Sequence, residues 1–179
     1  MSTTSTIGLF YGTDTSNTEM VGQKIQQQFS ELDQLVELHD IKDSDINTLL
    51  DYDFLILGIP TWDFGGIQSD WEDVGDALSE LDLSGKVIAL YGLGDQFGYG
   101  DYFVDAIGWL HEKLANTGAT FIGQWSTEGY DFEASRGANA DKTEFVGLAI
   151  DEDQQFDLTD QRVEQWVIQL YAEQALAAA

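Results

Sequence analysis

Hydroxyl-bearing side chains crowd one segment near the start of the chain, residues 12–18, which reads Gly-Thr-Asp-Thr-Ser-Asn-Thr. A short apolar run precedes it and an amphipathic pattern follows, so the segment is predicted to be a tight turn between a buried strand and a helix. Backbone N–H groups and the positive end of a helix dipole meet at such a turn, where they can bind an anion. Because the segment contains no Lys or Arg, a phosphate bound there would be held by neutral donors. The alternative is a serine- and threonine-rich helix cap that binds nothing.

Two later loops place aromatic side chains among glycines. Residues 60–66 read Pro-Thr-Trp-Asp-Phe-Gly-Gly, and residues 92–101 read Gly-Leu-Gly-Asp-Gln-Phe-Gly-Tyr-Gly-Asp; each follows an apolar run. Aromatic rings supply stacking faces, and glycines let the backbone approach the edge of a bound ring. Beside an anion-binding turn, the two loops could therefore sandwich a flat ring system that carries a phosphate tail. The alternative is that Trp62 and Tyr99 only cover the end of a sheet.

Apolar runs and amphipathic patterns alternate along the chain. The patterns predict strands at 7–11, 35–39, 54–59, 87–91, 120–125 and 145–150. They also predict a short helix or capped turn at 43–50, a polar stretch at 126–144, and longer helices after the first, third, fourth and last of these strands. This alternation predicts an α/β fold, a three-layer doubly wound sandwich with helices on both faces of a parallel sheet. Right-handed crossovers bring the carboxyl ends of the strands to one edge of the sheet, where ligands bind. The three loops described above are expected to meet at that edge.

The composition narrows the classes of function. The chain has 179 residues and is expected to form a single domain, 1–179. It has no cysteine, which excludes disulfides and cysteine-ligated metal centres. No secretory signal or membrane-spanning stretch is visible in the sequence, which predicts a cytoplasmic location. The formal net charge of −26 repels nucleic acid and anionic membranes. Two explanations of the acidity stay open, steering onto basic partner proteins and adaptation to high salt.

Taken together, the motifs resemble those of the flavodoxins, specifically the long-chain type. The resemblance runs from Ile7 to about Leu170, and it rests on Thr-x-Thr-x-x-Thr at 13–18, Pro-Thr-Trp at 60–62, Gly-Asp-Gln-x-Gly-Tyr at 94–99, Gln-Trp-Ser-Thr-x-Gly-Tyr at 124–130 and Phe-Val-Gly-Leu-Ala-Ile-Asp-Glu-Asp at 145–153. It implies a five-stranded parallel sheet in the order 2-1-3-4-5, whose last strand is interrupted by an insertion at about 126–144. It also implies one tightly and noncovalently bound FMN.

The resemblance further implies a role toward FMN for individual residues. The phosphate would be bound by Thr13, Asp14, Thr15, Ser16, Asn17 and Thr18, with an added hydroxyl from Thr61. Trp62 and Tyr99 would stack on the two faces of the isoalloxazine ring. The remaining contacts would come from the backbone of Asp63, Phe64 and Gly65 at the N5 edge, the backbone of Leu93, Gly94 and Asp95 at the pyrimidine edge, and Asp153 at the ribityl hydroxyls.

Two positions depart from the usual pattern of the family. Asp14 places a carboxylate in the phosphate loop, and we expect it to point outward so that only its N–H faces the ligand. Leu93 stands where a threonine is frequent, so one side-chain contact to the flavin is expected to be missing there while a backbone contact is kept.

The function that the resemblance implies is that of a low-potential one-electron carrier rather than an enzyme, with no catalytic residue and no metal. Negative charge around the flavin opposes the charge gained on reduction and lowers the potential. The implied partners are a ferredoxin/flavodoxin–NADP reductase or photosystem I and acceptor redox enzymes, which would dock transiently on a monomer. The alternative on the same fold is an FMN-dependent NAD(P)H:quinone oxidoreductase, which needs a substrate pocket beside the ring.

Overall fold

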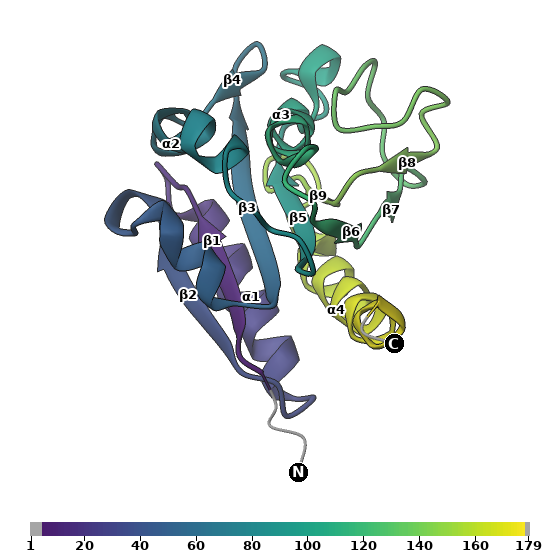
Figure 1. Ribbon diagram of the computed structural model, residues 1–179. Coiled ribbons are helices and arrows are strands. Elements are labelled where there is room, and N and C mark those ends of the chain that lie inside the picture. Colours follow the sequence, from purple (N-terminus) through teal and green to yellow (C-terminus); the bar gives the residue numbers. More distant parts are fainter. Residues whose placement is uncertain (1–4, 178–179) are drawn as a thin grey trace.

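A mostly parallel β-sheet forms the centre of the molecule (Figure 1). The computed structural model describes residues 5–177. Its main strands lie in the order β2-β1-β3-β5-β6 and run parallel; they are β1 (Ile7–Tyr11), β2 (Val36–Asp40), β3 (Phe54–Trp62), β5 (Val87–Leu93) and β6 (Thr120–Ile122). The predicted order 2-1-3-4-5 is confirmed. The two ends of the expected domain, and the first residues of the segment expected to carry no secretory signal, lie outside the described residues.

The last strand is divided in two, as expected. Strand β6 pairs with residues 87–89 of β5, and β9 (Leu148–Ile150) pairs with residues 91–93 of the same strand. Between them the chain leaves the sheet and forms a small antiparallel pair, β7 (Trp125–Ser126) and β8 (Glu144–Phe145). The insertion is therefore wider than the predicted 126–144. The apolar residues Trp125 and Phe145 extended the predicted strands, but they face each other in this separate pair.

The sheet is not entirely parallel, which corrects the expected architecture in one detail. Strand β3 continues to Trp62, three residues beyond the predicted end, and pairs antiparallel with the two-residue strand β4 (Gly66–Ile67). The chain reverses through Asp63, at φ 44°, and Gly65, at φ 82°. Positive φ suits glycine and strains aspartate. This hairpin lifts the loop after β3 above the sheet edge.

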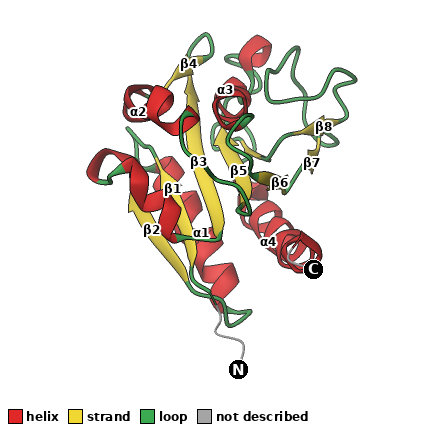
Figure 2. Ribbon diagram, in the orientation of Figure 1, coloured by secondary structure: helices red, strands yellow, loops and turns green. Residues whose placement is uncertain are grey.

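Helices cover both faces of the sheet (Figure 2). On one face, α1 (Asn17–Ser30) and α4 (Thr159–Ala177) pack over a buried cluster that includes Val21, Phe29 and Trp166. On the other face, α2 (Ser69–Ser79) and α3 (Asp105–Leu114) pack over a second cluster. Short 3-10 helices occupy Ile41–Asp43, Ile46–Asp51, Gly100–Tyr102 and Phe156–Leu158. The second of these, capped by the Asp45 side chain, is the short helix or capped turn predicted at 43–50. None of the helices in residues 5–177 combines the length and apolar composition that crossing a bilayer requires.

Three loops leave the sheet at neighbouring points of one edge. Tyr11 pairs in register with Gly58, and Gly58 pairs with Tyr91. The N–H of Gly12 donates to the Gly58 carbonyl at 3.2 Å, which ties the loop after β1 to β3. The expectation that the loops after β1, β3 and β5 meet at the carboxyl edge of the sheet is therefore confirmed.

Candidate cofactor site

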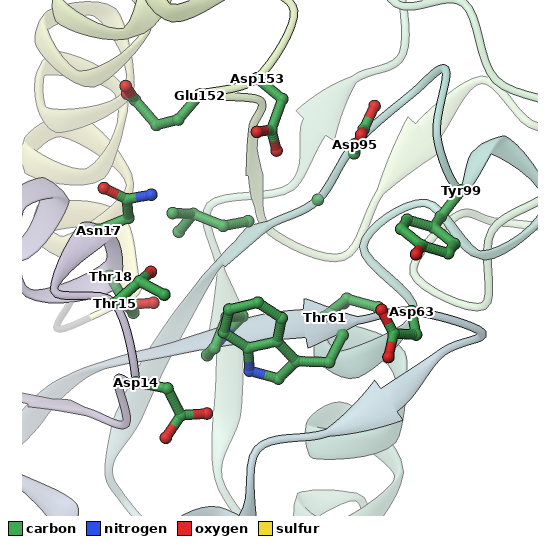
Figure 3. A pocket seen from close by; sticks show the side chains of 14 residues that line it. Asp14, Thr15, Asn17, Thr18, Thr61, Asp63, Asp95, Tyr99, Glu152 and Asp153 are labelled. Carbon is green, nitrogen blue, oxygen red and sulfur yellow. The ribbon is translucent and has the colours of Figure 1, made fainter.

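A cavity of about 330 Å³ lies among these loops and is open on one side. Its volume falls within the range of small-molecule and cofactor sites. It is lined by Asp14, Thr15, Asn17, Thr18, Pro60, Thr61, Trp62, Asp63, Leu93, Gly94, Asp95, Tyr99, Glu152 and Asp153. In Figure 3, Thr15, Asn17 and Thr18 lie at one end and Tyr99 at the other, with Asp95, Glu152 and Asp153 along one side. The cavity is thus polar and hydroxyl-rich at one end and aromatic at the other.

The hydroxyl-rich end is the amino end of helix α1. Ser16 occupies the N-cap position at φ 69°, in the left-handed region, and no side chain caps the helix by a hydrogen bond. The first N–H groups of α1 are therefore available to a ligand, where the helix dipole favours an anion. The hydroxyl of Thr13 is buried and has no hydrogen-bond partner among the described residues. Because the hydroxyls do not cap the helix, the arrangement favours the anion site over the helix-cap alternative.

Asp14 lies at the rim of this end. Its Oδ1 is 3.4 Å from the amide nitrogen of Gln68, at the start of α2. Figure 3 shows the carboxylate directed away from Thr15, Asn17 and Thr18. The carboxylate therefore does not point at the position proposed for the anion.

The aromatic end is formed by Trp62, the last residue of β3, and by Tyr99, on the loop after β5. The indole Nε1 of Trp62 is buried without a hydrogen-bond partner among the described residues. Tyr99 is 36% exposed and contacts Phe64 edge to face, with ring centroids 5.7 Å apart. A hydrogen bond to the Asp63 carboxylate, together with its negative charge, raises the pKa of the Tyr99 phenol above its usual value. Tyr99 therefore stays neutral at physiological pH and keeps a flat, uncharged face.

The loop after β5 is held by its own polar groups. The N–H of Gly94 donates to the Ile150 carbonyl at 3.0 Å, so this donor is already used. Oδ1 of Asp95 accepts hydrogen bonds from the N–H groups of Phe97 and Gly98 and from the Gln154 amide. Burial acts to raise the pKa of Asp95, but these hydrogen bonds outweigh it and lower the pKa. Asp95 therefore remains ionised and fixes the turn that presents Tyr99.

Thr61, near the end of β3, has a hydroxyl oxygen that already takes part in a hydrogen bond. It accepts from the N–H of Ala106 at 3.0 Å. Its proton remains to donate to a ligand in the cavity, which is compatible with the predicted role toward a phosphate.

Carboxylates surround the cavity, and no Lys or Arg lines it in the described part of the chain. Burial first, and then the charges of Asp95, Asp151 and Glu152, raise the pKa of Asp153 above its usual value. The same residues supply no metal site: no group of three His, Cys, Asp or Glu within residues 5–177 is placed to hold an ion. The site therefore offers neutral donors and aromatic faces within a negative field.

The raised pKa of Asp153 predicts how its removal changes stability with pH. A carboxyl whose pKa is higher in the folded state binds its proton more tightly there, so its contribution is fully present below the unfolded pKa and is lost as pH rises through the folded pKa. We expect Asp153→Asn to raise the free energy of unfolding at about pH 7 by about 0.3 kcal/mol, a small value because the side chain is exposed to screening solvent. No gain is expected at about pH 3.5.

The measurement is urea unfolding of the FMN-free protein at both pH values. Asp73→Asn, on the exposed face of α2, makes the same change of net charge and serves as the control. Equal gains in the two variants would show that only the overall repulsion had been relieved.

The structure gathers most of the predicted site residues into one cavity. Of those predicted from the sequence, only Thr13, Ser16, Phe64 and Gly65 do not line it. Phe64 is 76% exposed, and its ring contacts the rings of Tyr99 and Tyr102 edge to face. Pro60 and Glu152 line the cavity and were not predicted as site residues. Both are sequence neighbours of predicted residues, Thr61 and Asp153, and this adjacency was the signal that could have identified them.

The residues present suit FMN. The free N–H groups of α1 and the unpartnered Thr13 hydroxyl suit a phosphate, while Trp62 and Tyr99 at the other end suit a flat aromatic ring. The cavity joins the two ends without a break. A phosphate joined to a ring by a polar chain matches that order of donors and aromatic faces.

Comparison with known proteins agrees with this arrangement. Residues 9–166 match the model of the family described as Flavodoxin. The chain is 52% identical to "Flavodoxin 2" of Escherichia coli, over 94% of this chain and 96% of that protein, and 49% identical to "Flavodoxin" of Nostoc sp., over 93% and 96%. The crystal structure of Fusobacterium nucleatum flavodoxin bound to flavin mononucleotide superposes with a TM-score of 0.87 at 31% identity, covering 94% of this chain and 98% of that one. The chain belongs to the flavodoxin family.

Proposed function

We propose that the chain binds FMN noncovalently in this cavity and works as a low-potential one-electron carrier. One observation carries the proposal: a single cavity joins an uncapped, hydroxyl-rich helix amino end to a pair of aromatic side chains. Family membership and the FMN bound to the Fusobacterium relative support the same ligand.

The chain's own residues divide the work of binding. Residues 13–18 and Thr61 hold the phosphate through N–H and hydroxyl groups, and Trp62 and Tyr99 cover the two faces of the ring. The backbone at 63–65 and 93–95 meets the ring edges, and Asp153 reaches the ribityl chain. When bound, FMN supplies one-electron redox chemistry. The carboxylates of Asp63, Asp95, Glu152 and Asp153 surround the cavity without a cation, so added negative charge there is disfavoured and the potential is low.

We assign the chain no catalytic residue of its own. Flavodoxins are electron-transfer proteins, and the proposal extends this to the absence of enzymatic activity in this chain. No observation favours the alternative, an NAD(P)H:quinone oxidoreductase. The proposed partners are a ferredoxin/flavodoxin–NADP reductase or photosystem I and acceptor redox enzymes, docking transiently on a monomer in the cytoplasm.

Titration of FMN into the FMN-free protein, followed by quenching of flavin fluorescence, tests the proposal. We expect tight 1:1 binding and, with a ferredoxin–NADP reductase and NADPH, reduction of the bound flavin at a rate that falls as salt rises. The absence of FMN binding would refute the assignment. Fast NADPH oxidation by the loaded protein alone would favour the oxidoreductase instead.

Thr15 allows the phosphate end of the site to be tested separately. Its exposed side chain lines the cavity, and a hydrogen bond to a charged group contributes about 1.5–3 kcal/mol. We expect Thr15→Val to raise the Kd for FMN by about ten-fold and to leave the Kd for riboflavin, which lacks the phosphate, unchanged. Thr120→Val, on the exposed edge of β6, is the control. An equal loss for both ligands would place Thr15 away from the phosphate.

A further inference from the structure

Gln96 is a buried polar side chain that joins three segments of the chain. It is only 4% exposed and does not line the cavity. Its Nε2 donates to Oδ2 of Asp151 and to Oε1 of Gln155, each at 2.8 Å, and its Oε1 accepts from the N–H of Asp131 at 2.6 Å. All hydrogen-bonding positions of the amide nitrogen are therefore used, and the loop after β5, the loop after β9 and the insertion are tied to one group.

Asp151 forms the other half of this arrangement. It is fully buried, and its carboxylate accepts four N–H groups. The backbone and side chain of Gln96 donate to Oδ2, and the backbones of Asp153 and Gln154 donate to Oδ1. No Lys or Arg forms an ion pair with it among the described residues. A buried carboxylate needs such donors, so loss of the Gln96 amide group removes one of the four, while the backbone N–H of residue 96 remains.

The segments that meet at Gln96 carry one wall of the cavity. The cavity is lined by close sequence neighbours of Gln96 and Asp151. Asp95 directly precedes Gln96, Tyr99 lies three residues after it, and Asp153 lies two residues after Asp151. A second link, from the Gln154 amide to Asp95 at 3.0 Å, closes the same two loops. Beyond this region Tyr99 is partly exposed and contacts the still more exposed Phe64. The position of this wall therefore depends on Gln96 and Asp151, which do not line the cavity themselves.

The insertion reaches this wall through the same side chain. The Asp131 N–H donates to Gln96, and the amide of Gln155 donates to the Gly129 carbonyl at 3.0 Å. Two further backbone bonds, from Glu133 and Ala134 to the Gly100 carbonyl, hold the insertion against the far end of the loop after β5. The insertion thus contacts the loop that carries Tyr99 at both of its ends.

We propose that Gln96, together with Asp151, is a positioning residue for the flavin ring. By fixing the loop after β5 against the loop after β9 and the insertion, it holds Tyr99 and the backbone at 93–95 in the geometry that receives the ring. The inference rests on the proposed binding of FMN. Groups held in place before binding lose less freedom when the ligand arrives, so affinity depends on this pair although neither residue contacts the ligand.

Gln96→Met tests the proposal, because methionine has nearly the same length and removes the amide. We expect the Kd for FMN to rise by about ten-fold, which corresponds to the loss of roughly one well-formed buried hydrogen bond in the binding geometry. The Kd for riboflavin should rise by the same factor, since Gln96 and Asp151 act at the ring end of the site and not at the phosphate end. The visible circular dichroism of bound FMN, which reports the asymmetry around the ring, should change as well.

Two further variants make the result decisive. Gln169→Met removes a half-buried amide with two hydrogen bonds on α4, remote from the cavity, and should leave both Kd values unchanged. Gln155→Met removes one hydrogen-bond partner of Gln96, on a less buried side chain, and should raise the Kd for both FMN and riboflavin by about three-fold. If Gln96→Met does not fold, this variant tests the proposal in its place.

Unchanged Kd values and an unchanged dichroism spectrum in Gln96→Met, with the FMN-free protein merely less stable, would show that the pair is structural only and would overturn the inference. Failure of the wild-type chain to bind FMN would instead refute the proposed function.

Discussion

Replacing Trp62 by alanine is expected to raise the Kd for FMN by roughly 10- to 100-fold. Stacking of a planar base on an aromatic side chain is worth about 1–3 kcal/mol when that side chain is truncated, and about 1.4 kcal/mol is a factor of ten in affinity. The indole lines the cavity from the end of β3, where Trp62 pairs with Gly66 of β4 across the reversal at Asp63 and Gly65. The variant removes one face of the proposed sandwich and leaves the phosphate loop intact.

The measurement is a fluorescence titration with FMN and, in parallel, with riboflavin. Because both ligands carry the ring, their Kd values should rise by the same factor. Trp109→Ala is the matched control: its indole is likewise half-buried, but it lies on α3 against Lys113 and does not line the cavity. If the two alanine variants bind FMN equally well, Trp62 does not stack on the ring, and the aromatic end of the cavity has another role.

The positions of the binding loops could be predicted because they depend on local pattern. The apolar runs before Gly12, Pro60 and Gly92 form strands that are buried except at Val87, and the geometry of parallel sheets brings the loops after them to one edge. The order of the strands in the sheet could not be predicted from local pattern. It came from the family resemblance, because apolar periodicity does not determine which strands pair.

Features that depend on long-range contacts could not be predicted from the sequence. The hairpin of β3 and β4 needs Asp63 at positive φ, a strained conformation that no sequence pattern indicates. The limits of the insertion were misplaced because Trp125 and Phe145 are as apolar as strand residues of the main sheet. The connection of Gln96 to Asp151 joins residues 55 positions apart, and a single glutamine in a polar loop carries no sign of it.

The distribution of charge bears on the two explanations of the acidity. Carboxylates line the cavity, but others lie far from it, and several basic side chains are used in exposed ion pairs such as Lys24–Asp160 on α1 and α4 and Lys113–Asp76 on α3 and α2. Steering of a partner needs only the acidic face around the cavity, whereas an effect on the whole surface needs the rest. The acidic residues around the cavity are compatible with steering of a partner, and those elsewhere on the surface are compatible with adaptation to high salt.

Gly58→Ala is expected to lower the free energy of unfolding by about 3 kcal/mol, at the upper end of the usual cost of overpacking a core. Gly58 lies in the middle of β3, where the ring of Tyr91 packs directly on its Cα. A Cβ at this position would lie 2.1 Å from Cζ of Tyr91, and the ring is fully buried and cannot move aside.

The strain should also reach the proposed phosphate loop. The Tyr91 hydroxyl donates to the Thr18 carbonyl in the first turn of α1 at 2.9 Å, and the Gly58 carbonyl accepts from the N–H of Gly12. Displacing Tyr91 or this part of β3 therefore moves both ends of the phosphate loop. Because the phosphate end of the site is the part disturbed, we expect the Kd for FMN to rise by a larger factor than the Kd for riboflavin.

Urea unfolding of the FMN-free protein measures the effect on stability, and the two titrations measure the effect on binding. Gly100→Ala is the control, since its Cβ would meet nothing closer than the Glu133 nitrogen at 3.8 Å and its φ is not in the left-handed region. The control should change stability by less than about 1 kcal/mol, in either direction, because alanine also restricts the unfolded chain. A loss of similar size in both variants would mean that the contact with Tyr91 is not what requires glycine at position 58.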